Sequence, residues 1–154
     1  MKKIAFFAGI LSATTSVLAL TLTVAPKANA INVKAVDTVV IIEESGAMGG
    51  EQSWIQQVIP SLESAFKAEG FGAGTDSNRY GLVGFGSGGS GVLGRTLTAN
   101  GNQLFGASDF ATAASQLVTS GGFEDGYSAI DYTFNNYNFR SGAVKNFFLV
   151  TDED

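Results

Sequence analysis

The sequence contains no cysteine and no histidine among its 154 residues. Without cysteine the chain cannot form a disulfide bond, so its stability depends on a hydrophobic core. The two absences also exclude thiol nucleophiles, histidine-based catalytic triads and ordinary zinc sites, which need these side chains. We therefore expect a protein that is not an enzyme.

Basic residues are also few. The chain has 9 Lys and Arg against 14 Asp and Glu, which gives a formal net charge of −5. The basic residues are scattered along the sequence and form no stripe, so nothing predicts binding to nucleic acid or to an anionic membrane surface. The acidic balance favours solubility and identifies no ligand by itself.

Residues 1–30 have the composition of a secretory signal peptide. Lys2-Lys3 is a basic start, Ile4 to Val24 is mostly apolar, and Ala28-Asn29-Ala30 is a small-x-small cleavage site. A retained membrane anchor is the alternative, but the cleavage site favours removal. Cleavage would change the net charge from −5 to −8, because it removes three lysines and no acid. We predict a protein that is secreted or held in the cell envelope, with no membrane span after cleavage.

The remaining chain, residues 31–154, is long enough for one domain with its own core. Short apolar runs alternate there with segments of helical periodicity, which predicts an α/β fold. The expected strands are Asp37–Glu43, Tyr80–Phe85, Val92–Leu97 and Val144–Thr151, and the expected helices are Glu51–Glu69, Asp109–Val118 and Glu124–Tyr137. Continuous apolar runs are typical of parallel strands covered on both faces, so we expect a doubly wound, Rossmann-like, mostly parallel sheet.

Two of these helices carry apolar residues at helical spacing, which we expect to face the core. In the first helix these residues are Trp54, Ile55, Val58, Ile59, Leu62, Ala65 and Phe66. In the last helix they are Tyr127, Ile130, Phe134 and Tyr137. Pro60 lies inside the first pattern and is expected to kink or divide that helix.

The stretch from Asp37 to Gly50, DTVVIIEESGAMGG, places acids and a hydroxyl directly after the expected central strand. Open α/β sheets have their ligand sites at the carboxyl ends of their strands. The stretch resembles the first strand and metal-binding loop of a von Willebrand factor type A (vWA) domain, whose pattern is Asp-x-Ser-x-Ser. In this chain the three positions are Glu43, Ser45 and Ala47.

Three later stretches resemble the same family in the same order. They are RYGLVGFG from Arg79 to Gly86, EDGY from Glu124 to Tyr127 and NFFLVTD from Asn146 to Asp152. Each stretch alone is weak evidence for the family, but the three in this order are specific to it. The resemblance covers roughly residues 37–154. A vWA domain normally continues beyond this last strand, so we expect an incomplete domain whose last strand has an unpaired edge.

The resemblance implies a site for Mg²⁺ or Mn²⁺ built from oxygen ligands on three loops, with one position open for a carboxylate of the partner. Glu43, Ser45 and Asp152 match this set by position. Ala47 replaces a hydroxyl ligand, and Phe123 stands where a threonine ligand is expected. The metal-ion-dependent adhesion site is therefore degenerate, and we expect its metal binding to be weak or lost.

Three other acids near the site could replace the missing ligands: Glu44, Glu124 and Asp125. No sequence pattern shows whether their side chains point toward the metal position.

By resemblance, the chain is an exported binding or adhesion module of a secreted bacterial type. It would recognise a protein or extracellular surface ligand through the loops at the carboxyl ends of the strands. One alternative is a metal-free structural or assembly module of the cell envelope. A remote alternative is a hydrolase that uses Glu43 and Asp152 as an acid/base pair, although the sequence shows no substrate pocket.

Overall fold

The computed structural model describes residues 34–74, 76–88, 92–122 and 125–152. All of them belong to one compact unit, Asn32–Asp154. The predicted signal peptide, Phe123 and Glu124 lie outside the described residues. No helix in the described ranges combines the length and the apolar character that crossing a membrane requires.

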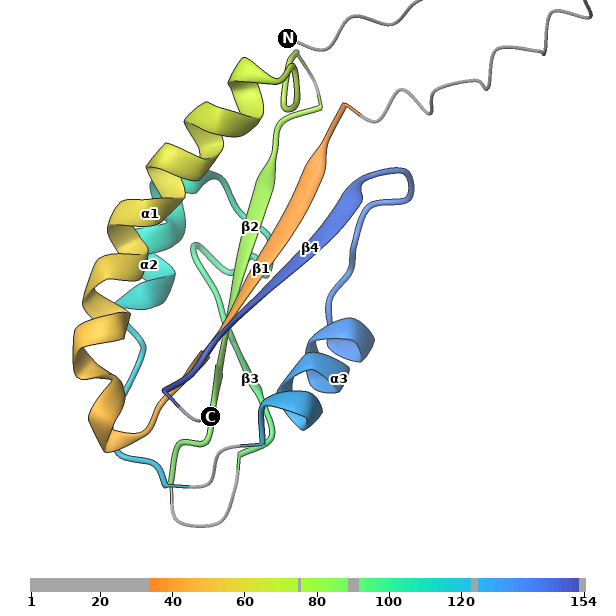
Figure 1. Cartoon of the computed structure of the whole chain (residues 1–154). Coiled ribbons are helices and arrows are strands. Elements are labelled where there is room, and N and C mark those ends of the chain that lie inside the picture. The colour runs from red at the N-terminus through yellow and green to blue at the C-terminus, as the bar shows by residue number, and fades with distance from the viewer. Residues whose placement is uncertain (1–33, 75, 89–91, 123–124, 153–154) are drawn as a thin grey trace, which may run out of the picture. The chain divides into compact units, whose positions relative to one another are not determined.

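A mixed, mostly parallel sheet forms the centre of this unit (Figure 1). Its four described strands lie in the order β3-β2-β1-β4, with β1 parallel to both β2 and β4, and β3 antiparallel to β2. The strands are β1 (Val36–Glu43), β2 (Arg79–Phe85), β3 (Arg95–Leu97) and β4 (Val144–Val150). The four predicted strands and the α/β class are confirmed.

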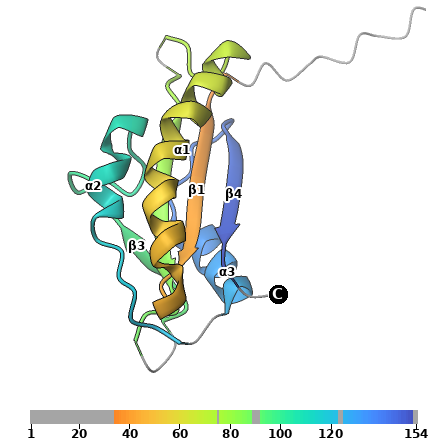
Figure 2. The same ribbon diagram turned by 60° about the vertical axis from the view of Figure 1, so that its left-hand side comes forward.

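Helices cover both faces of the sheet (Figures 1 and 2). One face carries α1 (Gly49–Ala68) and the short α2 (Phe110–Ala114), and the other carries α3 (Gly126–Asn136). Single-turn 3₁₀ helices, Gly46–Met48 and Ala107–Asp109, precede α1 and α2. This arrangement is compatible with a Rossmann-like fold.

The core consists of two apolar clusters, one on each face of β1. Side chains alternate between the faces along a strand. Val40 and Ile42 therefore pack with α1 and α2, whereas Val39 and Ile41 pack on the side of α3. All 8 residues of β1 are buried, as expected for the central strand of a covered parallel sheet.

The predicted division of the first helix at Pro60 is wrong, because α1 continues as one helix through this residue. Its predicted core face is also too wide. Ile55 and Ile59 are buried, but Trp54 is 44% exposed and Val58 is 39% exposed. The apolar stripe therefore extends beyond the part of the sheet that α1 covers.

The predicted aromatic core face of α3 is wrong for two of its members. Tyr127 is 89% exposed and Phe134 is 63% exposed, and the fully buried residues of the helix are Ala129 and Thr133. Their small side chains allow the helix backbone to approach the sheet closely. Tyr137, just past the helix, is buried as predicted, and its hydroxyl donates a hydrogen bond to the Leu82 carbonyl at 2.8 Å.

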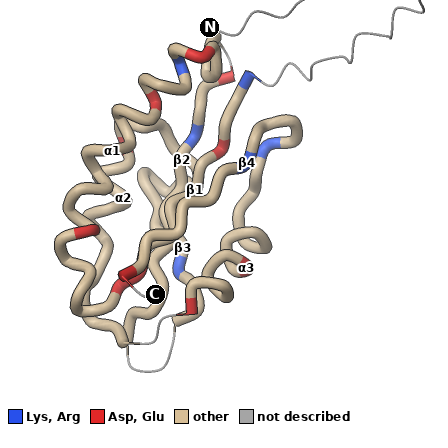
Figure 3. The backbone as a smooth tube through the Cα atoms, in the orientation of Figure 1, with Lys and Arg blue, Asp and Glu red and all other residues tan. Residues whose placement is uncertain are grey.

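Charged residues are distributed along the backbone of several elements, with acidic and basic positions interspersed (Figure 3). The described part of the molecule therefore presents no basic stripe of the kind that tracks a nucleic-acid backbone. This arrangement agrees with the scattered basic residues of the sequence.

Candidate functional site

The candidate site lies where β1 and β4 end and the turn before α1 begins. Ile42 is the register partner of Val150, and Glu43 is the partner of Phe85, so the strands end at one edge of the sheet. Ser45 follows in the turn that leads to the first 3₁₀ helix. The parallel sheet thus brings together segments that lie about a hundred residues apart in the sequence.

Two buried oxygen atoms at this edge have no described hydrogen-bond partner. The Glu43 side chain is fully buried, and its Oε2 accepts a hydrogen bond from Thr151 Oγ1 at 2.5 Å, but its Oε1 accepts none. Ser45 Oγ is also buried and has no partner in the described part of the chain. Leaving a buried polar group unpaired costs about 1–3 kcal/mol, and more for a charged group. The two atoms therefore have unused capacity to bind a ligand.

The end of β1 and the turn after it, which carry these two atoms, are fixed by hydrogen bonds from α1 and from the segment after α2. Gln52 Nε2 donates to the Glu43 carbonyl at 3.1 Å and to the Val118 carbonyl at 2.8 Å. The backbone N–H groups of Ser120 and Gly121 donate to the Glu44 carbonyl at 3.0 and 2.9 Å. The position of the turn is therefore set before any ligand binds.

The loop after β2 and the segment after α2 also approach each other closely beside the site. A Cβ atom added at Gly121 would lie 1.7 Å from the carbonyl oxygen of Gly86, which follows β2. Only glycine permits this approach of the two backbones. The loop after β2 and the segment after α2 are consequently packed directly against each other beside the site.

Glu44 does not serve as a replacement ligand. Its carboxylate forms an ion pair with Arg95 of β3, whose Nε donates to Oε2 at 2.7 Å, and it also accepts the Val118 N–H at 2.9 Å. This fully buried side chain points to the face of α1, opposite to that of Glu43, as alternation along the chain requires. Glu44 joins β1, β3 and the segment after α2.

Asp125 is also used structurally. Its side chain caps α3 by accepting hydrogen bonds from Ser128 N at 2.9 Å and Ser128 Oγ at 2.6 Å. These hydrogen bonds hold the pKa of Asp125 below its ordinary value. Asp125 therefore acts as an N-cap, and the third open candidate, Glu124, lies outside the described residues.

The other predicted site residues are placed as follows. Asp152 is exposed and lies one residue beyond Thr151. Ala47 is exposed in the 3₁₀ helix Gly46–Met48. The residue that sequence reasoning missed is Thr151, whose hydroxyl donates a hydrogen bond to Glu43. The signal for it was a hydroxyl residue at the end of a predicted parallel strand.

The donor set fits a hard divalent cation only in part. A carboxylate oxygen and a hydroxyl suit Mg²⁺ or Mn²⁺, which prefer oxygen ligands and retain several waters. Within the described ranges, no group of three or more acidic side chains could hold a metal ion. A cation at Glu43 and Ser45 would thus depend on water and on single side chains such as Asp152, which predicts low affinity.

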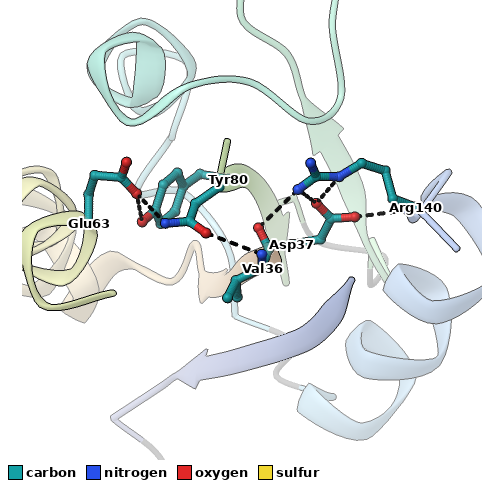
Figure 4. Close-up of polar contacts among 6 residues, drawn as sticks. Val36, Asp37, Glu63, Tyr80 and Arg140 are labelled. Carbon is teal, nitrogen blue, oxygen red and sulfur yellow. Dashed lines mark hydrogen bonds and ion pairs between the residues drawn. The ribbon is translucent and has the colours of Figure 1, made fainter. Parts of the chain in front are cut away.

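The amino end of β1 contains a very different polar network (Figure 4). Asp37 is fully buried, and its Oδ1 and Oδ2 accept hydrogen bonds from Arg140 Nε at 2.9 Å and Arg140 N at 2.8 Å. These contacts join the start of β1 to the segment before β4. Both carboxylate oxygens are paired.

A second group at the same end is joined through Asn78. Asn78 Oδ1 accepts the Val36 N–H at 3.2 Å, and Asn78 Nδ2 donates to Glu63 Oε2 at 3.0 Å. The Tyr80 hydroxyl donates to the same oxygen at 2.8 Å (Figure 4). Burial and the neighbouring Glu63 carboxylate raise the pKa of Tyr80 above its ordinary value, so this hydroxyl keeps its proton.

Comparisons of the chain with family models, with curated proteins and with solved structures find no match. The fold and the candidate site are therefore argued from this chain's own sequence and geometry. The vWA resemblance remains a prediction from the sequence.

Proposed function

We propose that the chain is an exported, vWA-like binding module. It would recognise a protein or an extracellular surface ligand through the loops at the carboxyl ends of β1, β2 and β4. A weak divalent-cation site at Glu43, Ser45 and Asp152 would contribute to that recognition. The described α/β sheet with helices on both faces is compatible with this proposal.

The observation that supports the proposal best is a pair of buried oxygen atoms, Glu43 Oε1 and Ser45 Oγ, that have no hydrogen-bond partner among the described residues. Buried polar groups in folded proteins nearly always have partners, and exceptions often mark functional sites. Glu43 ends β1 and Ser45 lies in the turn that follows, and the surrounding hydrogen bonds hold this segment in place. A bound cation would satisfy both atoms and would leave a coordination position for an acidic group of the partner.

A calorimetric titration of the unit formed by residues 32–154 with Mn²⁺ tests this proposal. We expect weak binding that is lost in Glu43→Gln, because the amide removes the charge and keeps the size of the side chain. Glu69→Gln is the matched control, since Glu69 is an exposed acid at the end of α1. Equal Mn²⁺ binding by all three proteins would contradict a site at Glu43.

A gain-of-function variant tests the alignment with the family. Combining Glu43→Asp, Ala47→Ser and Phe123→Thr would restore the ligands that the vWA pattern expects. We expect much tighter Mn²⁺ binding by this variant than by the natural sequence. Unchanged affinity in a folded variant would mean that the three positions do not correspond to those of the family.

The metal-free structural or assembly module is kept as a second candidate because β4 is an edge strand of the described sheet. An unpaired strand edge can join another chain without any metal. The hydrolase alternative has no such support, since the Glu43 carboxylate is fully buried and bonded to Thr151.

A further inference from the structure

The segment after β3 contains a tight turn, Asn100-Gly101, whose two flanking residues are joined by a pair of backbone hydrogen bonds. Ala99 N donates to the Asn102 carbonyl at 3.1 Å, and Asn102 N donates to the Ala99 carbonyl at 2.9 Å. Both central residues have a positive φ, 52° at Asn100 and 78° at Gly101. Two positive φ values in succession define a type I′ hairpin turn. The turn therefore presents an asparagine followed by a glycine at its exposed tip.

An asparagine followed by a glycine is a chemically reactive pair. The backbone nitrogen of the glycine can attack the side-chain carbonyl carbon of the asparagine, because glycine has no Cβ that obstructs the approach. Around Gly101 there is open space, since an added Cβ would meet no atom within 4 Å. No group in the described ranges accepts a hydrogen bond from the Gly101 N–H. Hydroxide in the solvent can therefore remove this proton, which makes the nitrogen a nucleophile.

The backbone of this turn is also close to the conformation that the reaction requires. The attack closes a five-membered succinimide ring, which holds ψ of its first residue at about −120°, the value at the first central residue of a type II′ turn. Asn100 already has the positive φ of that position. Rotating the peptide between Asn100 and Gly101 converts type I′ into type II′ and makes φ of Gly101 negative, which glycine tolerates. Both turn types fit a two-residue hairpin, so the flanking residues keep their pairing.

We propose that Asn100 is a site of spontaneous modification in the folded protein. The Gly101 nitrogen forms a bond to Cγ of Asn100, the bond between Cγ and Nδ2 breaks, and the amide group leaves as ammonia with the proton that the Gly101 nitrogen has lost. Water then opens the succinimide at either of its two carbonyl carbons. The products are aspartate and isoaspartate, in which the main chain runs through the side-chain carbons. Water is the only other reactant.

Both products change the hairpin that follows β3. Each replaces a neutral amide by a carboxylate and so adds a negative charge at neutral pH. Isoaspartate also lengthens the main chain, which then no longer fits a two-residue turn. The turn leads directly to Phe105, which exchanges two backbone hydrogen bonds with Tyr80 of β2, each of 2.8 Å. The modification therefore alters charge and backbone geometry next to a contact of the central sheet.

Peptide mapping by mass spectrometry, with detection of isoaspartate, tests the proposal. The unit of residues 32–154 has its own core and is incubated folded, in mildly alkaline buffer. We expect isoaspartate and aspartate to accumulate at Asn100, faster at higher pH because the attacking nitrogen must lose its proton. Asn138 is the control within the chain, since it is also exposed but is followed by Phe139, whose side chain hinders the attack. We expect Asn138 to stay unmodified over the same time.

Two variants test the separate steps of the reaction. Gly101→Ala places a methyl group on the attacking residue, and we expect modification at Asn100 to become roughly tenfold slower. Asn102→Ala removes a hydrogen bond from Asn102 Nδ2 to the Asn100 carbonyl, at 3.3 Å, which opposes the rotation of the peptide. We expect modification to become roughly threefold faster in this variant. Both substituted positions are exposed, so we expect unchanged circular dichroism spectra before incubation.

A folded unit that keeps Asn100 intact, over a time in which the unit unfolded in urea is modified there, would overturn the proposal, because the turn would then prevent the attack. Aspartate without isoaspartate would also overturn it, since a succinimide opens to both. An unchanged rate in Gly101→Ala would contradict attack by the Gly101 nitrogen, and an unchanged rate in Asn102→Ala would contradict the rotation of the peptide. None of these results bears on cation binding at Glu43, which the Mn²⁺ titration measures separately.

Discussion

The two ends of β1 bury acidic side chains in opposite ways. At the amino end, Asp37 is fully buried and both of its oxygens are paired with Arg140. At the carboxyl end, Glu43 is equally buried, but Thr151 pairs only one of its oxygens. Glu44, the next residue, is fully paired with Arg95 and Val118.

The contrast distinguishes two acids that stabilise the fold, Asp37 and Glu44, from one candidate functional acid, Glu43. All three lie in β1 or directly after it. Removing the partner of a buried charge is strongly destabilising, so Asp37 and Glu44 contribute to the stability of the fold. An incompletely paired buried carboxylate is instead a local cost, and such costs occur where a site serves function. Four variants without added metal test the contrast.

The largest loss of folding stability is expected from Asp37→Asn. The substitution leaves the Arg140 guanidinium, which is only partly exposed, without its carboxylate. We expect a loss of about 3 kcal/mol in the free energy of unfolding, measured with urea. The exposed-acid variant Glu69→Gln should change this free energy by less than about 0.5 kcal/mol. Equal, small effects of both variants would show that the amino-end network contributes little.

The second-largest loss of folding stability is expected from Gly121→Ala, which tests the close contact between the two loops beside the site. The added Cβ would lie 1.7 Å from the Gly86 carbonyl oxygen, so the two loops must separate. We expect a loss of about 2 kcal/mol, as for other overpacked positions. The adjacent Gly122→Ala is the control, because no atom lies within 4 Å of its added Cβ. Equal stability of the two variants would contradict the close loop packing.

Only a small change in folding stability is expected from Glu43→Gln in the absence of metal. The amide can still accept the Thr151 hydrogen bond, and burying an amide costs less than burying a carboxylate. We expect no loss, and a gain of up to about 1 kcal/mol in urea unfolding. A loss comparable to that of Asp37→Asn would mean that Glu43 is a stabilising acid like Asp37.

The smallest effect is expected in the acid stability of Glu63→Gln. Burial alone would raise the pKa of Glu63, but hydrogen bonds from Lys67, Asn78 and Tyr80 outweigh it, so the pKa lies below its ordinary value of 4.5. A lowered pKa in the folded state stabilises the fold above pH 4.5, and this stabilisation is lost as the pH falls through the folded-state pKa. Glu63→Gln should thus lose less stability on acidification than the natural sequence. Parallel pH profiles would contradict this role of Glu63.

β1 and β2 could be predicted from the sequence because nearly all of their residues are buried, so that both strands appear as runs rich in apolar residues. Which side of α3 faces the solvent could not be predicted in this way. Tyr127 and Phe134 satisfy the helical period, yet Ala129 and Thr133 face the sheet, because close packing of a helix backbone favours small side chains. Periodicity shows that a helix has an apolar stripe, but not which neighbouring stripe fits the sheet.

At the candidate site, the sequence located Glu43 at the end of the central strand and Ser45 in the turn that follows it. It could not show that Glu44 is used by Arg95, because this pairing depends on the antiparallel addition of β3 fifty-one residues later. Nor could it identify Thr151 as the partner of Glu43, which follows from the register of β4 with β1. Side-chain partners across a sheet depend on tertiary register, which local patterns do not contain.

The thermal unfolding of the natural unit and of Glu43→Gln, each with and without Mn²⁺, tests the central contrast most directly. Our account predicts that Mn²⁺ raises the melting temperature of the natural unit, because a ligand that binds only the folded state stabilises it. It also predicts that Mn²⁺ leaves the melting temperature of Glu43→Gln unchanged. An equal response of the two proteins, or no response of either, would contradict the assignment of Glu43 and Ser45 as a cation site.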